Sequence, residues 1–173
     1  PGNIGVGHTR YSTTGSSHVA NAQPAVVETR LGEIALAHNG NLVNTTQLRD
    51  ELLKKSCNLT TTTDSEMIAL AIAEEINEGA EFLEGAVRAF NRCRGAFSLV
   101  IGTSEGVMGV RDPNGIRPLV IGTLEGSPTR YVLASETCAL DIIGAKYVRD
   151  VEPGELVWIT QDGLESFYWG QKQ

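Results

Sequence analysis

The second half of the sequence, from Ala96 to Trp169, is a series of short strand-like segments joined by turn sequences. The turns at Asp112–Gly115, Pro153-Gly154 and Asp162-Gly163 are rich in residues that favour tight reversals of the chain. A block of helical sequence, residues 44–93, precedes this series. Because strands follow strands and helices follow helices, the sequence predicts an α+β fold with antiparallel sheets and argues against a doubly wound parallel sheet.

The expected strands have the alternation or the short apolar runs that strands require. They cover residues 3–11, 25–29 and 33–38 before the helical block, and 96–102, 106–111, 118–122, 131–134, 146–149, 155–160 and 164–169 after it. A short helix over residues 135–143 interrupts the second series and ends at Gly144.

Three helices are expected in the central block. Asn44 and Thr63 are N-cap residue types, and each has Gln or Glu three residues later, the spacing of a capping box. The body of the second helix, residues 67–76, is apolar nearly all round, which indicates burial between layers. The third helix is expected over residues 82–93. The apolar face of the first helix consists of Leu48, Leu52 and Leu53.

Composition limits the possible functions of these 173 residues. A hydrophobic content of 41% and a net charge of −7 suit one globular domain over residues 1–173 and argue against a nucleic-acid binder. No apolar run approaches the ~18 residues that a membrane span needs. The three cysteines and three histidines lack the spacing of a disulfide framework or a metal site, so a reducing, cytoplasmic protein without a metal is expected.

The segment His38-Asn39-Gly40-Asn41 follows an expected strand and allows two interpretations. Asn-Gly is a strong signal for a two-residue hairpin turn. A capped helix follows, however, and no returning strand does. An Asn carboxamide beside a Gly backbone N–H can instead supply two donors to a developing oxyanion, as in acyl-transfer sites.

Two further residues are candidates for substrate binding. Arg10 ends the first expected strand beside the polar loop Ser12–Ser17, and it is either a surface arginine or a ligand for a carboxylate. Asp64 lies in the first turn of a helix, where it either complements the helix dipole or receives an ammonium group. Together with Asn39 and Gly40, these two residues would bind both charges of an α-amino acid near its side-chain carbonyl.

Five motifs occur along the sequence in the order Gly7–Tyr11, Ala37–Leu42, Thr62–Glu66, Arg111–Leu119 and Ala134–Glu136. With these motifs the chain resembles class II glutamine amidotransferases over nearly its whole length, and within them the amidophosphoribosyltransferase group. The stretch Asp112–Leu119, with Tyr11 and Asn41-Leu42, favours that group over the glutaminase domain of glucosamine-6-phosphate synthase.

The resemblance implies an αββα sandwich of the N-terminal-nucleophile hydrolase type, with two antiparallel sheets between helical layers. It implies that Arg10 binds the α-carboxylate of glutamine, with Thr13 nearby, and that Asp64 binds the α-ammonium. Asn39 and the N–H of Gly40 would form the oxyanion hole. The site would hydrolyse glutamine to glutamate and ammonia.

The resemblance also implies features that this sequence lacks. The family nucleophile is an N-terminal cysteine with its own α-amine as base. Residue 1 is Pro1 here, so we expect an N-terminally truncated domain that does not hydrolyse glutamine by itself. A phosphoribosyltransferase domain, expected to need Mg²⁺, would use the ammonia to make phosphoribosylamine, with Arg111 and Arg117 facing that domain. The complete enzyme is expected to be a homo-oligomer, and an iron–sulfur cluster in it stays open, as does a non-catalytic glutamine-binding role.

Overall fold

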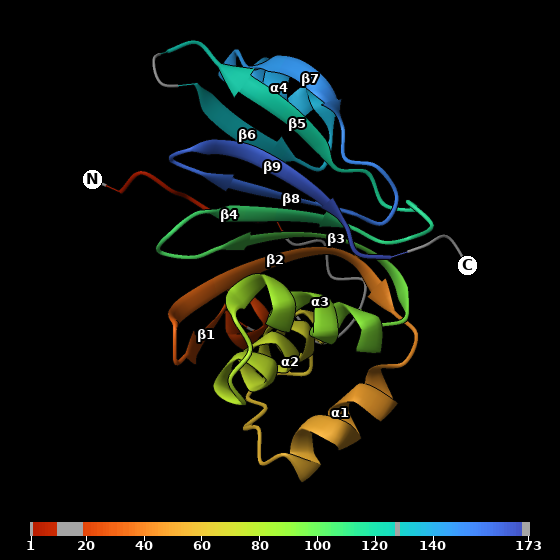
Figure 1. Cartoon of the computed structure of the whole chain (residues 1–173). Coiled ribbons are helices and arrows are strands. Elements are labelled where there is room, and N and C mark those ends of the chain that lie inside the picture. The colour runs from red at the N-terminus through yellow and green to blue at the C-terminus, as the bar shows by residue number, and fades with distance from the viewer. Residues whose placement is uncertain (1, 10–18, 127–128, 171–173) are drawn as a thin grey trace.

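The computed structural model describes residues 2–9, 19–126 and 129–170. Within them the chain forms two antiparallel sheets and two helical layers (Figure 1). The larger sheet has the order β1-β2-β3-β4-β8-β9 and the smaller one β6-β5-β7. The strands of the larger sheet are β1 (Ala25–Thr29), β2 (Gly32–Leu42), β3 (Gly95–Gly102), β4 (Val107–Arg111), β8 (Glu155–Thr160) and β9 (Gly163–Tyr168). Those of the smaller sheet are β5 (Val120–Leu124), β6 (Arg130–Ala134) and β7 (Lys146–Asp150).

Helices cover the outer face of each sheet, so the layers run αββα as predicted (Figure 1). One layer contains α1 (Thr45–Lys54), α2 (Asp64–Asn77) and α3 (Phe82–Arg92), and the other contains α4 (Thr137–Ile143). A 3₁₀ turn, Val19–Asn21, precedes β1. In the described part of the chain, no helix has the length and apolar character needed to cross a bilayer.

Three hydrophobic clusters hold these layers together. The largest joins the larger sheet to α1–α3 and includes Leu36, Ile72 and Phe90. The second lies between the sheets, around Ile121 and Val157. The third joins the smaller sheet to α4 and consists of the buried residues Val120, Leu140 and Ala145. The order of the clusters follows the order of the layers.

The sequence explains why α2 begins where it does. The hydroxyl of Thr63 accepts a hydrogen bond from the backbone N–H of Glu66, as expected of an N-cap. The Glu66 carboxylate accepts hydrogen bonds from the backbone N–H groups and hydroxyls of Thr60 and Thr61 at 2.5–2.8 Å. Because Asp64 lies between these two fixed residues, its position at the start of α2 is well defined.

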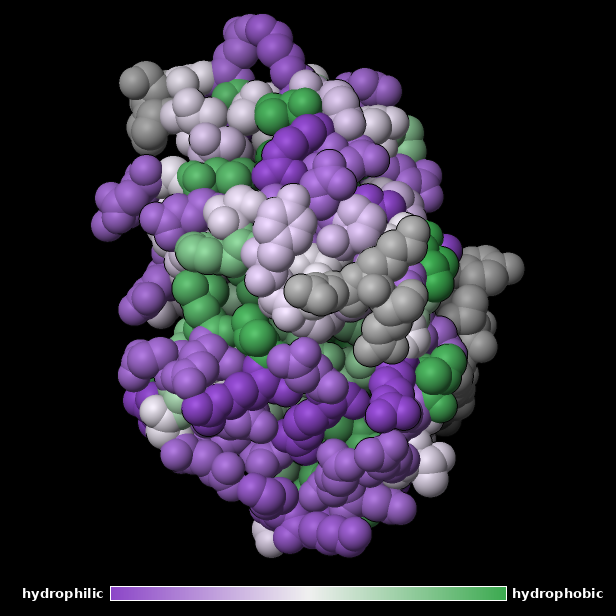
Figure 2. All heavy atoms as spheres, turned by 45° about the vertical axis from the view of Figure 1, so that its right-hand side comes forward, coloured by the Kyte–Doolittle hydropathy of each residue, from purple (hydrophilic) through white to green (hydrophobic). Residues whose placement is uncertain are grey.

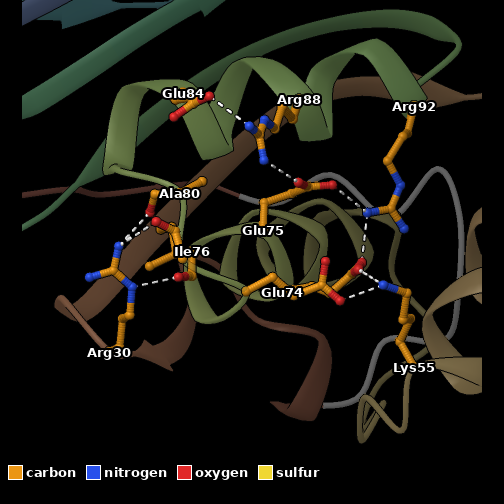
Figure 3. A network of polar contacts seen from close by, with 11 residues as sticks. Arg30, Lys55, Glu74, Glu75, Ile76, Ala80, Glu84, Arg88 and Arg92 are labelled. Atoms are coloured by element: carbon orange, nitrogen blue, oxygen red, sulfur yellow. Dashed lines mark hydrogen bonds and ion pairs between the residues drawn. The ribbon is translucent and has the colours of Figure 1, made fainter.

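Charged side chains tie the helical layer together from outside (Figure 3). Arg92 of α3 lies 2.6 Å from Glu74 of α2, and Lys55, just after α1, lies 3.1 Å from the same carboxylate. Arg30, in the β1–β2 turn, donates to the carbonyls of Ile76 and Ala80 at 2.6 and 2.8 Å. Figure 2 shows that hydrophilic side chains cover the end of the molecule formed by α1–α3, on the face in view.

Four predictions about the fold are wrong. Residues 3–9 form no strand, because no described strand pairs with them. The strand predicted at 33–38 continues to Leu42, because it pairs with β3 along that length. Asn44 makes no side-chain cap and instead bonds the backbone of Arg92 and Arg94 at 2.9 Å. Leu53 is half exposed, so only its two partner leucines are buried in α1.

The remaining helices and strands lie within about two residues of their predicted positions, as expected for boundaries judged from sequence.

Candidate functional site

The candidate site is built on the centre of β2. The backbone N–H of His38 donates to the side-chain oxygen of Gln23 at 2.7 Å, and that of Leu42 donates to Asp64 at 3.2 Å. Backbone N–H groups two residues apart on a strand point to the same side. The pairing of β2 with β3 is regular from Ala35 to Leu42, so the N–H of Gly40 points to this same edge. Gly40 therefore presents a donor on the side where Asp64 lies.

Only glycine fits at position 40. Its φ is +151°, and a Cβ atom there would lie 2.8 Å from the Cα of Phe97 and closer still to the carbonyl oxygen of Ala96. The hairpin interpretation of residues 38–41 is thus wrong, because Asn-Gly lies inside a strand. The glycine serves a close approach of two strands instead of a reversal of the chain.

Asn39 is held by an arginine that is distant in sequence. The Nε–H of Arg117 donates to Oδ1 of Asn39 at 3.1 Å. This contact occupies the oxygen of the carboxamide and leaves its nitrogen as the group that can donate elsewhere. Arg111 and Arg117 were predicted to face another domain. That stays a prediction, because the contacts within this chain do not test it. Arg111 donates to the carbonyls of Gly115, Arg117 and Val151.

Asp64 lies at the edge of β2 beside a buried histidine. Its Oδ1 is 3.4 Å from Nδ1 of His38, and its Oδ2 accepts the N–H of Leu42. Burial by itself would raise the pKa of the Asp64 carboxyl. The hydrogen bonds from His38, Leu42 and Ser65 outweigh burial and hold that pKa below its usual range. Asp64 is therefore an anion at neutral pH.

These groups line one cleft of about 1300 Å³. His38, Asp64 and residues 7–9 line it, and so do Ser135, Glu136 and Cys138. Asn39, Gly40 and Arg117 also line it. The cleft thus combines a carboxylate, an amide and a backbone donor, which suits a ligand with an ammonium group and a polar carbonyl.

Of the residues predicted to form the site, the structure brings Asn39, Gly40 and Asp64 to this one cleft. Arg10 and Thr13 lie outside the described residues. Sequence reasoning missed the contact between Arg117 and Asn39, because the two are 78 residues apart. The motif Asp112–Leu119, which contains Arg117, was recognised in the sequence. Its turn residues do not indicate which strand the motif contacts.

The three cysteines are free thiols. Burial raises the pKa of Cys93 to about 12, and its Sγ contacts the carbonyl of Ala89. Burial also raises the pKa of Cys57. Both therefore stay protonated at neutral pH, which argues against a nucleophilic role. Cys138 is exposed at the edge of the cleft, with its Sγ 3.9 Å from Glu136.

The described residues contain no cluster of three or more His, Cys, Asp or Glu side chains that could hold a metal ion.

The chain is similar over most of its length to curated proteins and solved structures. The chain is 68% identical over 166 residues to an amidophosphoribosyltransferase from Synechocystis, covering 95% of the chain and 34% of that protein. It is 66% identical to the enzyme of the same name from Synechococcus elongatus, covering 98% of the chain and 35% of that protein. The chain thus spans about a third of the length of the curated relatives it matches.

Two solved structures share the fold closely. One is the glutamine phosphoribosylpyrophosphate amidotransferase from B. subtilis, with a TM-score of 0.83 and 37% identity over 94% of this chain and 34% of that one. The other, described as the allosteric regulatory enzyme of purine biosynthesis, has a TM-score of 0.85 and 38% identity, covering 94% of this chain and 34% of that one. In addition, the model of the glutamine amidotransferase domain matches residues 8–141, most of the sequence. The chain therefore belongs to the glutamine amidotransferase domain family.

Proposed function

We propose that this chain provides the glutamine-binding and oxyanion-binding groups of the glutaminase site of an amidophosphoribosyltransferase. The observation that carries the proposal is the meeting of Asn39, Gly40 and Asp64 in one cleft. In this proposal Asp64 binds the α-ammonium of glutamine. Arg10 binds its α-carboxylate, and Thr13 lies beside it.

The reaction follows from these positions. A cysteine sulfur attacks the side-chain carbonyl carbon of glutamine, and the carbonyl oxygen gains the negative charge. The Nδ2 of Asn39 and the N–H of Gly40 donate to that oxygen, where fixed donors favour the transition state over the ground state. Collapse of the intermediate releases ammonia and leaves a thioester, which water hydrolyses to glutamate.

The sulfur nucleophile is not one of the chain's own cysteines in this proposal. Cys57 and Cys93 have raised pKa values, and all three cysteines are internal, so none carries a free α-amine as base. By itself, the 173-residue chain is therefore expected to bind glutamine without releasing ammonia.

The names of the relatives suggest the use of the ammonia. We propose that it displaces pyrophosphate from phosphoribosyl pyrophosphate to give 5-phosphoribosylamine, the first committed step of purine synthesis. That step belongs to a phosphoribosyltransferase domain, with Mg²⁺ bound there. We place the reaction in the cytoplasm, where free thiols such as these stay reduced, and in a homo-oligomer.

Replacement of Asn39 tests the proposal. The experiment uses the protein expressed from its own gene and not the 173-residue chain alone. Asn39→Ala is expected to lower the rate of glutamine hydrolysis about 10²- to 10³-fold, as for a lost oxyanion donor. Synthesis from free ammonia should continue, because it does not use this oxyanion. Asn91→Ala removes an exposed asparagine on α3 as a control.

The two activities separate the alternatives. If both fall together in Asn39→Ala, Asn39 has a structural role and the proposal fails. If the protein expressed from its own gene, rather than the 173-residue chain alone, binds glutamine and releases no ammonia, it is a glutamine-binding module, which is the second candidate function.

A further inference from the structure

Arg117 contacts Asn39 through a single, directional hydrogen bond. Its Nε–H donates to Oδ1 of Asn39 at 3.1 Å, and both residues line the cleft. A carboxamide has an acceptor on one side and a donor on the other. If it turned by half a rotation, Oδ1 would face the reacting carbonyl and repel the developing charge. The hydrogen bond from Arg117 disfavours that orientation.

The backbone of Arg117 is itself fixed. Its carbonyl accepts hydrogen bonds from the hydroxyl of Ser98 and from Nε of Arg111, each at 2.9 Å. Ser98 lies opposite Asn39 in the pairing of β2 with β3, so this support comes from the neighbouring strand. Arg117 therefore has a defined position relative to Asn39 before any ligand binds.

The turn that carries Arg117 is held by a buried carboxylate. Asp112 is fully buried and accepts the backbone N–H groups of Phe97, Asn114 and Ile116 at 2.9–3.2 Å. These bonds satisfy the Asp112 carboxylate inside the turn, so it does not compete for the guanidinium of Arg117. Rigid support of this kind is what positions a catalytic group to within a fraction of an ångström.

The charge of Arg117 also acts on the amide. The ion pairs formed by the described residues do not include Arg117. A cation that donates to Oδ1 draws electron density from the carboxamide and makes Nδ2–H a stronger donor. This polarisation increases the stabilisation that Asn39 offers to an oxyanion.

We propose that Arg117 is a positioning residue for the oxyanion hole, which orients and polarises the Asn39 carboxamide so that Nδ2 faces the reacting carbonyl. The proposal rests on the proposed function, because it assigns Arg117 a role through Asn39 in glutamine hydrolysis. It predicts an effect on turnover and little effect on glutamine binding.

A double-mutant cycle tests this coupling in the protein as expressed from its own gene. Arg117→Ala is expected to lower kcat for glutamine hydrolysis about 10- to 100-fold, as for loss of a hydrogen bond to a charged group, and to change KM less than about twofold. In an Asn39→Ala background the same change should lower kcat by no more than about twofold. Arg117→Gln replaces the guanidinium by a carboxamide that still has N–H donors, and it should recover part of the lost kcat.

Three outcomes would overturn the proposal. Equal losses in both backgrounds would show that Arg117 acts independently of Asn39. A raised KM with unchanged kcat would make Arg117 a glutamine ligand. A Gln variant no better than the Ala variant would exclude orientation by a hydrogen bond. Arg88→Ala is the matched arginine control, because Arg88 is half exposed on α3 and is not among the residues that line the cleft.

A second measurement does not depend on activity. In ¹⁵N-labelled 173-residue chain, Arg117→Ala should shift or broaden the side-chain NH₂ signals of Asn39 and leave the backbone amide signals of β1 unchanged. Unchanged NH₂ signals would overturn the positioning role. If the signals change but the protein expressed from its own gene has no glutaminase activity, the proposed function fails. The structural coupling between Arg117 and Asn39 then still stands.

Discussion

The two helical layers differ sharply in how much they bury. The layer of α1–α3 packs on the larger sheet through the largest hydrophobic cluster, and nine residues of α2 are buried. The layer of α4 buries only Leu140 of its own residues, and Ile142 is 85% exposed. On β7, Tyr147 and Val148 are both more than half exposed.

The residues that line the cleft come from both parts of the molecule. Asn39, Gly40 and Asp64 come from β2 and α2, in the densely packed part of the molecule. Ser135, Glu136 and Cys138, which also line the cleft, come from the sparsely packed part. The groups that we propose bind glutamine thus lie where packing restricts movement most.

The largest expected difference concerns the thiols. Burial raises the pKa of Cys93 from 9.0 to about 12, so its thiolate fraction at neutral pH is about 10³-fold below that of an ordinary cysteine. Cys138, in the sparsely packed part, is exposed. Labelling with iodoacetamide, followed by mass spectrometry, should therefore modify Cys138 long before Cys93.

Labelling in urea provides the control, because all three thiols should then react at similar rates. Equal labelling rates for Cys93 and Cys138 in the folded protein would contradict the difference in burial between the two parts of the molecule.

The next effect is on stability. Ile72 is completely buried in α2, so Ile72→Ala should lower the free energy of unfolding by about 2–5 kcal/mol. Ile142→Ala makes the same change at an exposed position on α4 and should alter stability by less than about 0.5 kcal/mol. Urea unfolding of both variants measures the contrast. A comparable loss in Ile142→Ala would mean that α4 is covered in solution.

The smallest effect is a pH dependence at the start of α2. Burial would raise the pKa of Glu66, but hydrogen bonds from Thr60 and Thr61 outweigh it and hold the pKa below 4.5. A depressed pKa in the folded state stabilises the protein above pH 4.5, and this contribution is lost as the pH falls through the lowered value. Glu66→Gln should cost about 1–3 kcal/mol at pH 7, as for hydrogen bonds to a charged group.

Unfolding measured between pH 7 and pH 3 tests this sign, because the stability of Glu66→Gln should fall less steeply than that of the unaltered chain. Glu84→Gln, at an exposed carboxylate paired with Arg88, serves as the control. Parallel pH profiles for the unaltered chain and Glu66→Gln would refute the role of Glu66.

Local patterns made much of the fold predictable. The cap at Thr63 and the apolar sequence of α2 lie within a few residues of one another, so the start and burial of this helix could be predicted. Asn39, Gly40 and Asp64 were grouped by their residue types and by a family resemblance, and the structure places all three in the lining of one cleft, while their roles stay a prediction.

Long-range contacts account for what was missed. The length of β2 depends on its pairing with β3, more than fifty residues later, and no local pattern reports that partner. The partner of Asn44 at the end of α3 and that of Asn39 at Arg117 are similarly distant. For Arg10 and Thr13 the predictions stay open, since neither lies among the described residues.

The side chains that flank Gly40 have a consequence for how this edge of the sheet meets other molecules. Gln23 and Asp64 bind the outward N–H groups of His38 and Leu42. An extended peptide adds to a sheet only where successive outward groups are open to it. Side-chain caps on both sides of Gly40 therefore protect this edge from strand addition and aggregation, while one backbone N–H between them still points outward for a small ligand.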